Sequence, residues 1–328
     1  MARDLYIQAL RGVAISAVVL IHCLPQSTVT VAVRPLLNFA VALFIFLSGY
    51  LTTPERCGDV LGFYRRRIGK VLAPYLVWSL FYLLARRVTD PVAIGEAILV
   101  GGGSAQMYYL LVYMQLVLVT PLLYRILDGG KVARLLLYAV TPALLVLRYA
   151  LGLLGLGQMH LGVFCGTWLV YYLLGLEWRD CIEPWLRARA VRMGALVIAL
   201  LVCLLAQEAE GFSWLAFGDY DLATTQLKLS AMAASCAFAL IAMYAPRAVR
   251  GRVASCAPLV ALGDHSFGVY LCHIAAVMVF SKVFSALGLG GIGVALVQWL
   301  LVLAASVAVV SALRRILPRR VLGWIGFE

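Results

Sequence analysis

The sequence predicts an all-α membrane protein that crosses the bilayer about ten times, with both termini on the cytoplasmic side. Three observations lead to this prediction: the composition, the recurrence of long apolar stretches and the distribution of positive charge. Of the 328 residues, 64% are hydrophobic and only 13% are charged. This number of charged residues is too small to cover the surface of a water-soluble fold. Lipid is therefore the expected solvent.

Apolar stretches of about 18 residues or more recur along the whole chain, and each can cross the ~30 Å hydrocarbon layer as a helix. A helix satisfies its own backbone hydrogen bonds, which lipid cannot do. No segment between the stretches is long enough for a soluble domain, so we expect one membrane-embedded domain over residues 1–328. The predicted spans are 7–24, 34–53, 68–86, 105–124, 134–152, 162–178, 192–209, 224–245, 260–281 and 291–313.

The orientation follows from the Lys and Arg residues. With the N-terminus inside, twenty of the 27 fall in predicted cytoplasmic segments or at the adjoining helix ends. Cytoplasmic loops of membrane proteins carry such an excess, which favours this orientation. The same distribution accounts for the net charge of +12 without a nucleic-acid partner. The expected location is the cell membrane, as a multi-pass protein of a bacterial inner or cytoplasmic membrane.

Two ionisable residues, Arg11 and His22, fall inside the first predicted span. Eleven positions at about 100° each bring them within about 20° of the same helix face, with a rise of about 16 Å. Ionisable groups at membrane depth are expensive and mark candidate functional sites. The alternative is that Arg11 reaches the cytoplasmic interface and His22 is a hydrogen-bonded interfacial histidine.

Short motifs around these residues follow one another in a fixed order along most of the chain. They are Ile7-Gln8-Ala9-Leu10-Arg11-Gly12-Val13-Ala14 with His22, Leu43-Phe44-Ile45-Phe46-Leu47-Ser48-Gly49-Tyr50, Tyr64-Arg65-Arg66-Arg67-Ile68-Gly69-Lys70-Val71-Leu72-Ala73-Pro74-Tyr75, Tyr171-Tyr172-Leu173-Leu174-Gly175 and Ser266-Phe267-Gly268-Val269-Tyr270-Leu271-Cys272-His273. Because these motifs occur in this order within ten predicted spans, the chain resembles the membrane acyltransferase 3 family.

The chain departs from the family pattern at three places. Gln8 stands where the family usually has Asp, Tyr108 or Tyr109 where Trp is common, and Ile274 where Pro often follows the histidine. The first departure leaves no acidic residue at that position to pair with the arginine of the first span.

The resemblance implies an O-acyltransferase that moves an acyl group, often acetyl, from cytoplasmic acyl-CoA to a hydroxyl of a carbohydrate or other cell-envelope acceptor. A neutral imidazole can take the proton of the attacking hydroxyl, and His22 is the candidate general base. Arg11 would orient the donor or stabilise charge on it, with Ser48 and Tyr50 as possible hydrogen-bond donors to the cofactor. Direct attack would need no acyl-enzyme.

A basic segment that precedes the third span and includes its first turn contains Arg65, Arg66, Arg67 and Lys70. Guanidinium groups bind phosphates in charge-assisted pairs, so these residues are candidates for holding the polyanionic head of acyl-CoA at the cytoplasmic mouth of a channel. The alternative is ordinary anchoring of a cytoplasmic loop by positive charge.

Two further polar residues in predicted spans, His273 and Gln115, are candidates for substrate binding. A histidine satisfied by a neighbouring helix and hydrogen bonding between helices are the alternatives. His160 and His265 are given no role. No metal is expected, because the four histidines are not at ligand spacing and no H-E-x-x-H motif occurs.

Two other functions remain open. A channel past Arg11 and His22 would equally serve a transporter of a small polar solute or an acyl compound, although no repeated broken-helix pattern is evident. A sensory or scaffolding membrane domain is the third possibility. The acceptor, the acyl group, the oligomeric state and the need for a separate extracytoplasmic partner are not determined by the sequence.

Overall fold

The computed structural model describes residues 3–154 and 161–328, and over these ranges it is helical with no strand. Nine helices of the described chain are long and apolar enough to cross a membrane. A shorter apolar helix, Cys165–Leu176, lies where the sixth of the ten spans was predicted. The all-helical membrane fold is therefore confirmed, and the orientation of the termini stays a prediction.

Contacts divide the chain into two compact units. Unit 1 comprises Met1–Phe44, Trp185–Pro318 and Phe327–Glu328, and unit 2 comprises Ile45–Pro184 and Arg319–Gly326. Two helices, α3 and α10, pass from one unit to the other. A single domain over residues 1–328 stays a prediction, and the two units are described separately.

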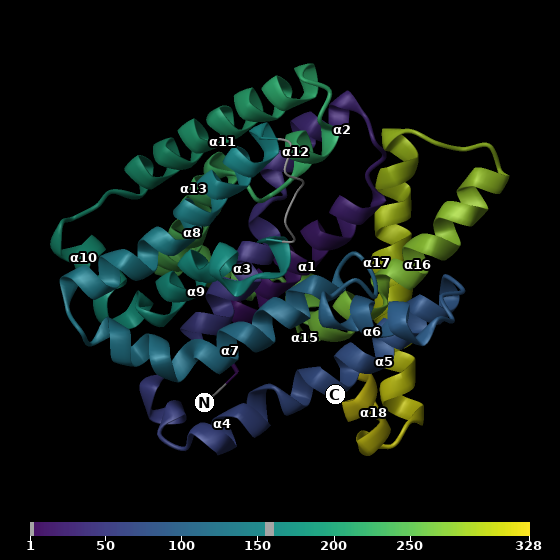
Figure 1. Ribbon diagram of the computed structural model, residues 1–328, viewed down its shortest axis with the longest axis horizontal. Coiled ribbons are helices and arrows are strands. Elements are labelled where there is room, and N and C mark those ends of the chain that lie inside the picture. The colour runs from purple at the N-terminus through teal and green to yellow at the C-terminus, as the bar shows by residue number, and fades with distance from the viewer. Residues whose placement is uncertain (1–2, 155–160) are drawn as a thin grey trace. The chain divides into compact units, whose positions relative to one another are not determined.

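Unit 1 holds the N-terminal helix and most of the second half of the chain (Figure 1). Its elements are α1(Leu5–Cys23), α2(Thr28–Val33), η1(Arg34–Leu36), the start of α3(Phe39–Tyr50), most of α10(Glu183–Ala188), α11(Met193–Ala216), α12(Tyr220–Thr224), α13(Leu229–Tyr244), α14(Arg247–Ala254), α15(Ala257–Asp264), α16(Ser266–Ala286) and α17(Ile292–Ile316).

Unit 2 holds the end of α3 and the helices that follow it, together with a short segment near the end of the chain. Its further elements are η2(Pro54–Cys57), α4(Val60–Arg67), α5(Gly69–Ala85), α6(Pro91–Leu99), α7(Met107–Leu127), α8(Lys131–Leu153), the 3-10 turns η3(Leu161–Val163) and η4(Cys165–Trp168), α9(Leu169–Leu176), the π-helical turn η5(Trp178–Ile182) and α18(Arg319–Ile325).

Helix α1 is the centre of unit 1. It begins where the Asp4 carboxylate accepts hydrogen bonds from the first backbone amides of the helix, as an N-cap does. Helices α15, α16 and α17 all pack against it, and α11 and α13 pack side by side (Figure 1). The closest approach is between α1 and α15, where Gly12 and Gly263 present no side chain and the backbones come into contact.

A second pair of glycines closes the core of unit 2. A Cβ on Gly49 of α3 would lie 3.1 Å from the Leu176 nitrogen, and a Cβ on Gly175 of α9 would lie 2.7 Å from the Tyr50 nitrogen. The Ser48-Gly49 motif therefore allows two helices to pack closely, as small residues do in membrane proteins.

Several predicted spans are interrupted in the structure. The second, 34–53, is divided into η1 and α3, and α2 precedes it, because Pro35 has no N–H with which to continue an α-helix. The sixth, 162–178, is divided into η3, η4 and α9, and the eighth, 224–245, has residues 225–228 between α12 and α13. The ninth is divided at His265, whose backbone ends α15 before α16 begins. The length and overall hydrophobicity of a span do not show such breaks.

Candidate functional site

Helix α1 carries both residues that sequence analysis placed on one face, and both are half-buried. The helix is continuous from Leu5 to Cys23, so Arg11 and His22 are separated by about 16 Å along its axis. This separation is too long for direct contact between their side chains. The two residues therefore belong to different surroundings, which are described in turn.

The imidazole of His22 is paired with that of His273, which comes from α16. Their ring centroids lie 5.3 Å apart and the ring planes are inclined by 45°. The His273 side chain is completely buried, whereas His22 keeps part of its surface exposed. The fold thus brings together the two histidines that sequence analysis considered as separate candidates.

Hydrogen bonds determine which nitrogen of His273 carries a proton. Nδ1 lies 3.1 Å from the Val269 carbonyl oxygen and 2.8 Å from that of Tyr270. A carbonyl oxygen only accepts, so Nδ1 is the donor and a neutral ring has its lone pair on Nε2. Among the described residues, Nε2 has no hydrogen-bond partner. His273 therefore offers a buried acceptor next to His22.

Sequence analysis did not select Arg34, a cation whose charge acts on His22. Arg34 lies at the start of η1 and is half-buried. Its Nε donates to the Thr224 carbonyl oxygen at 3.0 Å, which ties the break between α2 and α3 to the end of α12. The signal in the sequence is an arginine directly before Pro35, where a membrane helix must be interrupted.

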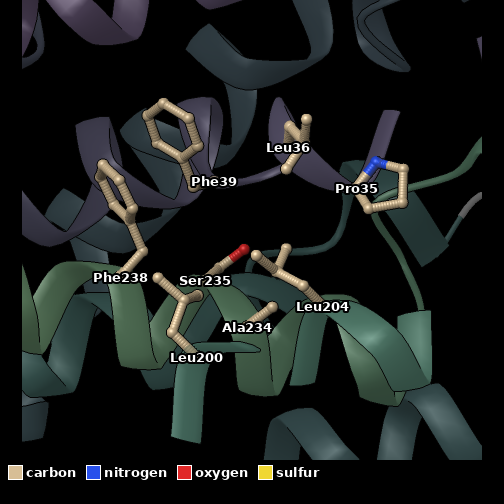
Figure 2. Close-up of a pocket in the computed structure, with 8 residues that line it drawn as sticks. All are labelled: Pro35, Leu36, Phe39, Leu200, Leu204, Ala234, Ser235 and Phe238. Atoms are coloured by element: carbon tan, nitrogen blue, oxygen red, sulfur yellow. The ribbon is translucent and has the colours of Figure 1, made fainter. Parts of the chain in front are cut away.

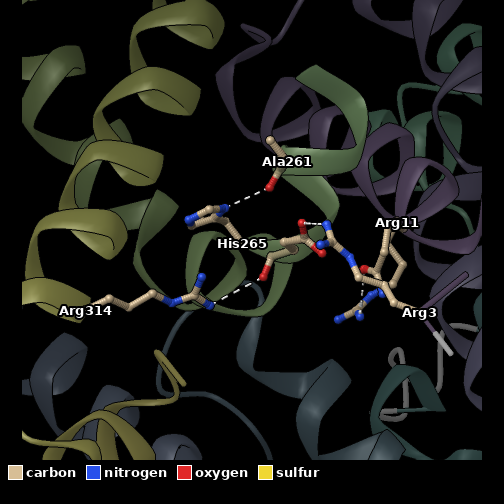
Figure 3. A network of polar contacts seen from close by, with 7 residues as sticks. Arg3, Arg11, Ala261, His265 and Arg314 are labelled. Atoms are coloured by element: carbon tan, nitrogen blue, oxygen red, sulfur yellow. Dashed lines mark hydrogen bonds and ion pairs between the residues drawn. The ribbon is translucent and has the colours of Figure 1, made fainter. Parts of the chain in front are cut away.

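Arg11 belongs to a polar cluster at the N-terminal end of α1 (Figure 3). Its Nη1 donates to the Gln8 amide oxygen at 3.3 Å, so a neutral amide is the partner at the position where no acid was found. Nearby, Arg3 forms an ion pair with Asp264, whose carbonyl oxygen accepts from Arg314 at 3.4 Å. The cluster joins α1 to the junction of α15 and α16 and to the end of α17.

His265 has a structural place beside this cluster. Its Nδ1 lies 2.8 Å from the Ala261 carbonyl oxygen (Figure 3). Its Nε2 lies 3.2 Å from the Ser311 hydroxyl. Both ring nitrogens are thus engaged within unit 1. His160 lies outside the described residues.

In unit 2, the predicted basic segment is the last turn of α4 and the start of α5. Arg65 and Lys70 are exposed. Arg66 forms an ion pair of 3.5 Å with Asp59, and both side chains are more than half exposed. These three basic residues can therefore reach a ligand in solution, and water screens the ion pair.

Arg67 differs from its neighbours because it is half-buried and bound to the end of α3. Its Nη2 donates to the Leu51 carbonyl oxygen at 3.0 Å and to the Thr52 hydroxyl at 3.2 Å. Arg179, from the π-helical turn η5, places its guanidinium 4.3 Å from the centre of the Tyr50 ring. Two guanidinium groups from different elements thus flank residues 50–52.

Two other candidate residues of unit 2, Ser48 and Gln115, have defined surroundings in the structure. The Ser48 hydroxyl is buried and has no hydrogen-bond partner among the described residues. Gln115 donates to the Val163 carbonyl oxygen at 2.8 Å and accepts from the Cys165 amide at 2.9 Å. Its amide therefore holds the backbone of η3 and η4, which gives it a structural part.

An apolar pocket of about 200 Å³ lies in unit 1 between η1, α3, α11 and α13 (Figure 2). The side chains that line it are Pro35, Leu36, Phe39, Leu200, Leu204, Ala234, Ser235 and Phe238. None of these eight residues is ionisable. The pocket suits an apolar group, and its lining offers no group for acid–base chemistry.

The comparison with protein families decides the class of the protein. A family model described as an acyltransferase domain, that of acyltransferase family 3, matches residues 4–315, which is nearly the whole chain. The chain belongs to this family. It is a multi-pass membrane acyltransferase, as the sequence motifs indicated. Neither the curated proteins nor the solved structures gave a match.

The matched range of the acyltransferase includes all the candidate residues. Unit 1 contains the histidine pair, Arg34 and Arg11, and unit 2 contains the basic residues around the end of α3. The chemistry that these groups can perform is proton transfer by imidazole, charge stabilisation by guanidinium and binding of phosphate.

Proposed function

We propose that this acyltransferase transfers an acyl group, acetyl as the first candidate, from acyl-CoA to a hydroxyl of a carbohydrate or other cell-envelope acceptor. The observation that carries the proposal is the pair of imidazoles, His22 and His273, within a helical membrane protein of the acyltransferase family. In the reaction the O–H bond of the acceptor and the C–S bond of the thioester break. A C–O bond and an S–H bond form.

His22 is the general base of this proposal. It keeps an exposed surface that an acceptor hydroxyl can reach, whereas His273 is completely buried. Proton removal by a positioned imidazole typically contributes about 100-fold to 10,000-fold to a rate.

Arg11 and the basic residues of unit 2 serve the donor. Arg11 lies about 16 Å along α1 from His22, which supports a part in holding acyl-CoA away from the reacting carbon. Arg65, Arg66, Arg67 and Lys70 provide the positive charge that the phosphates of CoA require. Ser48 and Tyr50 keep their proposed part as hydrogen-bond donors to the cofactor.

The experiment uses the purified full-length chain in lipid nanodiscs with acetyl-CoA and a panel of carbohydrate acceptors. Release of the CoA thiol and acetylation of the acceptor are measured together. We expect His22→Ala to lower turnover at least 100-fold while the Kd for acetyl-CoA stays within about twofold. His265→Gln is the matched control, because its ring nitrogens contact only Ala261 and Ser311 among the described residues.

Unchanged turnover of the His22→Ala protein would remove His22 from the mechanism. Uptake of a solute into proteoliposomes without consumption of the thioester would replace acyl transfer to an acceptor by transport, since both functions could use a channel along α1.

A further inference from the structure

Nε2 of His273, which has no hydrogen-bond partner among the described residues, has no part in the chemistry described so far. We infer that His273 is a positioning residue whose Nε2 accepts a hydrogen bond from the ring N–H of His22. This bond leaves the other nitrogen of His22 unprotonated for the acceptor hydroxyl. The inference rests on the proposed function, because it assigns a task to a neighbour of the general base.

The main chain of α16 fixes the proton of His273. Two carbonyl oxygens, those of Val269 and Tyr270, lie within hydrogen-bond distance of Nδ1. If the proton moved to Nε2, the lone pair of Nδ1 would face the lone pairs of two carbonyl oxygens and would be repelled by them. Water cannot relieve this repulsion, because the His273 side chain has no exposed surface. Nε2 is therefore held as an acceptor, which is how backbone carbonyls commonly select a histidine tautomer.

The distance between the rings suits a direct hydrogen bond. A nitrogen lies about 1.2 Å from the centre of an imidazole ring and an N–H···N bond is about 3 Å long, so the centres of bonded rings lie about 5.4 Å apart. The observed separation is 5.3 Å. Because the rings are inclined by 45° and Nε2 has no partner among the described residues, a rotation of one ring is still needed. His22 is the ring that can rotate, since His273 is tied to its own helix.

The hydrogen bond between His22 and His273 determines which nitrogen of His22 takes up and releases the proton in each step. The hydroxyl proton moves to the free nitrogen of His22 as oxygen attacks the thioester carbon, and the resulting imidazolium is stabilised by the lone pair of His273. The proton then passes from His22 to the CoA sulfur as the C–S bond breaks. No further reactant is required, and His273 touches neither substrate.

A purely structural part for His273 is the competing explanation, because its Nδ1 hydrogen bonds alone could justify a buried histidine in α16. The two explanations differ in which ring nitrogen matters. A structural residue needs Nδ1, whereas a positioning residue needs Nε2.

Two substitutions separate these nitrogens. In His273→Asn the amide group takes the place of Nδ1 and nothing replaces Nε2, whereas in His273→Gln the amide reaches the place of Nε2. We expect kcat of the Asn variant to fall about 100-fold with KM for acetyl-CoA unchanged, and kcat of the Gln variant to stay within about tenfold of the wild type. An Asn variant as active as wild type, or more active than the Gln variant, would overturn the inference.

A second measurement does not depend on the reaction. Nitrogen-15 spectra of histidine-labelled protein in nanodiscs report the protonated nitrogen of each ring, with His22→Ala and His265→Gln samples assigning the signals. We expect His22 to occupy one tautomer in the wild type and a mixture in the Asn variant. If the His22 signals are the same in both proteins, His273 does not position it. Absence of acyl transfer would contradict the proposed function and leave this spectral test intact.

Discussion

The contact between α1 and α15 provides a quantitative test of the packing around the candidate site. A Cβ added at Gly263 would lie 2.6 Å from the carbonyl carbon of Gln8, and closer still to its oxygen. Ordinary contacts begin at 3.4 Å, so Gly263→Ala must move the two backbones apart by about 0.8 Å or more. A backbone cannot change rotamer to relieve the clash, so we expect an overpacking cost of about 3 kcal/mol, the upper part of the usual range.

Alanine also favours the helical state over glycine by about 1 kcal/mol, which offsets part of this cost. The net loss is about 2 kcal/mol, or roughly a 30-fold shift toward the unfolded state. The assay is thermal unfolding of the purified protein in detergent, followed by tryptophan fluorescence, with an expected decrease in Tm of about 4 °C. Acetyl-transfer activity should fall as well, because Gln8 is the partner of Arg11.

Gly293→Ala is the matched control, since a Cβ there meets nothing within 4 Å and the residue also belongs to a helix of unit 1. It should unfold at the wild-type temperature or slightly above it. Equal Tm values for Gly263→Ala and Gly293→Ala would show that α1 and α15 do not approach as closely as described. The explanation of the glycine contact would then be wrong.

Two further predictions concern unit 2. Glu177→Gln should lower the free energy of unfolding by about 1–2 kcal/mol, because it removes the ion pair of 2.8 Å between Glu177 and Arg134. The loss is moderate since the Arg134 side chain is 41% exposed and water screens its charge. A denaturation series measures the loss, and an unchanged midpoint would count against this ion pair. Arg67→Gln should raise KM for acetyl-CoA about tenfold but leave KM for S-acetylpantetheine unchanged, since only the former carries the phosphates. Arg189→Gln is its control because the Arg189 guanidinium lies over the Trp185 ring and has no ion pair among the described residues. An equal rise of KM for both donors would exclude phosphate binding by Arg67.

Most of the helical segments could be predicted from the sequence, because the length and apolarity of a span are local properties. The interruptions could not be predicted in the same way. His265 ends α15 within a stretch that reads as one continuous span, and only the backbone path shows it. Pro35 was a visible signal for another break, since its missing N–H is a property of the residue itself.

The candidate site was predicted in part. Membrane depth and helical periodicity selected Arg11 and His22, and α1 carries both on one unbroken helix. Periodicity could not show that Arg11 contacts Gln8 while His22 contacts His273, because side-chain partners depend on which helices pack together. Arg34 was not selected from the sequence, since its electrostatic effect on His22 depends on the turn between α2 and α3.

The amino-acid sequence by itself determined that this protein is an all-helical membrane acyltransferase, because composition, span length and the order of motifs are properties of the linear sequence. Only the tertiary structure decided that the His22 and His273 rings meet, that backbone carbonyls hold the proton of His273 on Nδ1, and that two pairs of glycines bring their helices together. The physical reason is that these contacts join residues far apart in the chain. They exist only when particular helix faces are packed against one another.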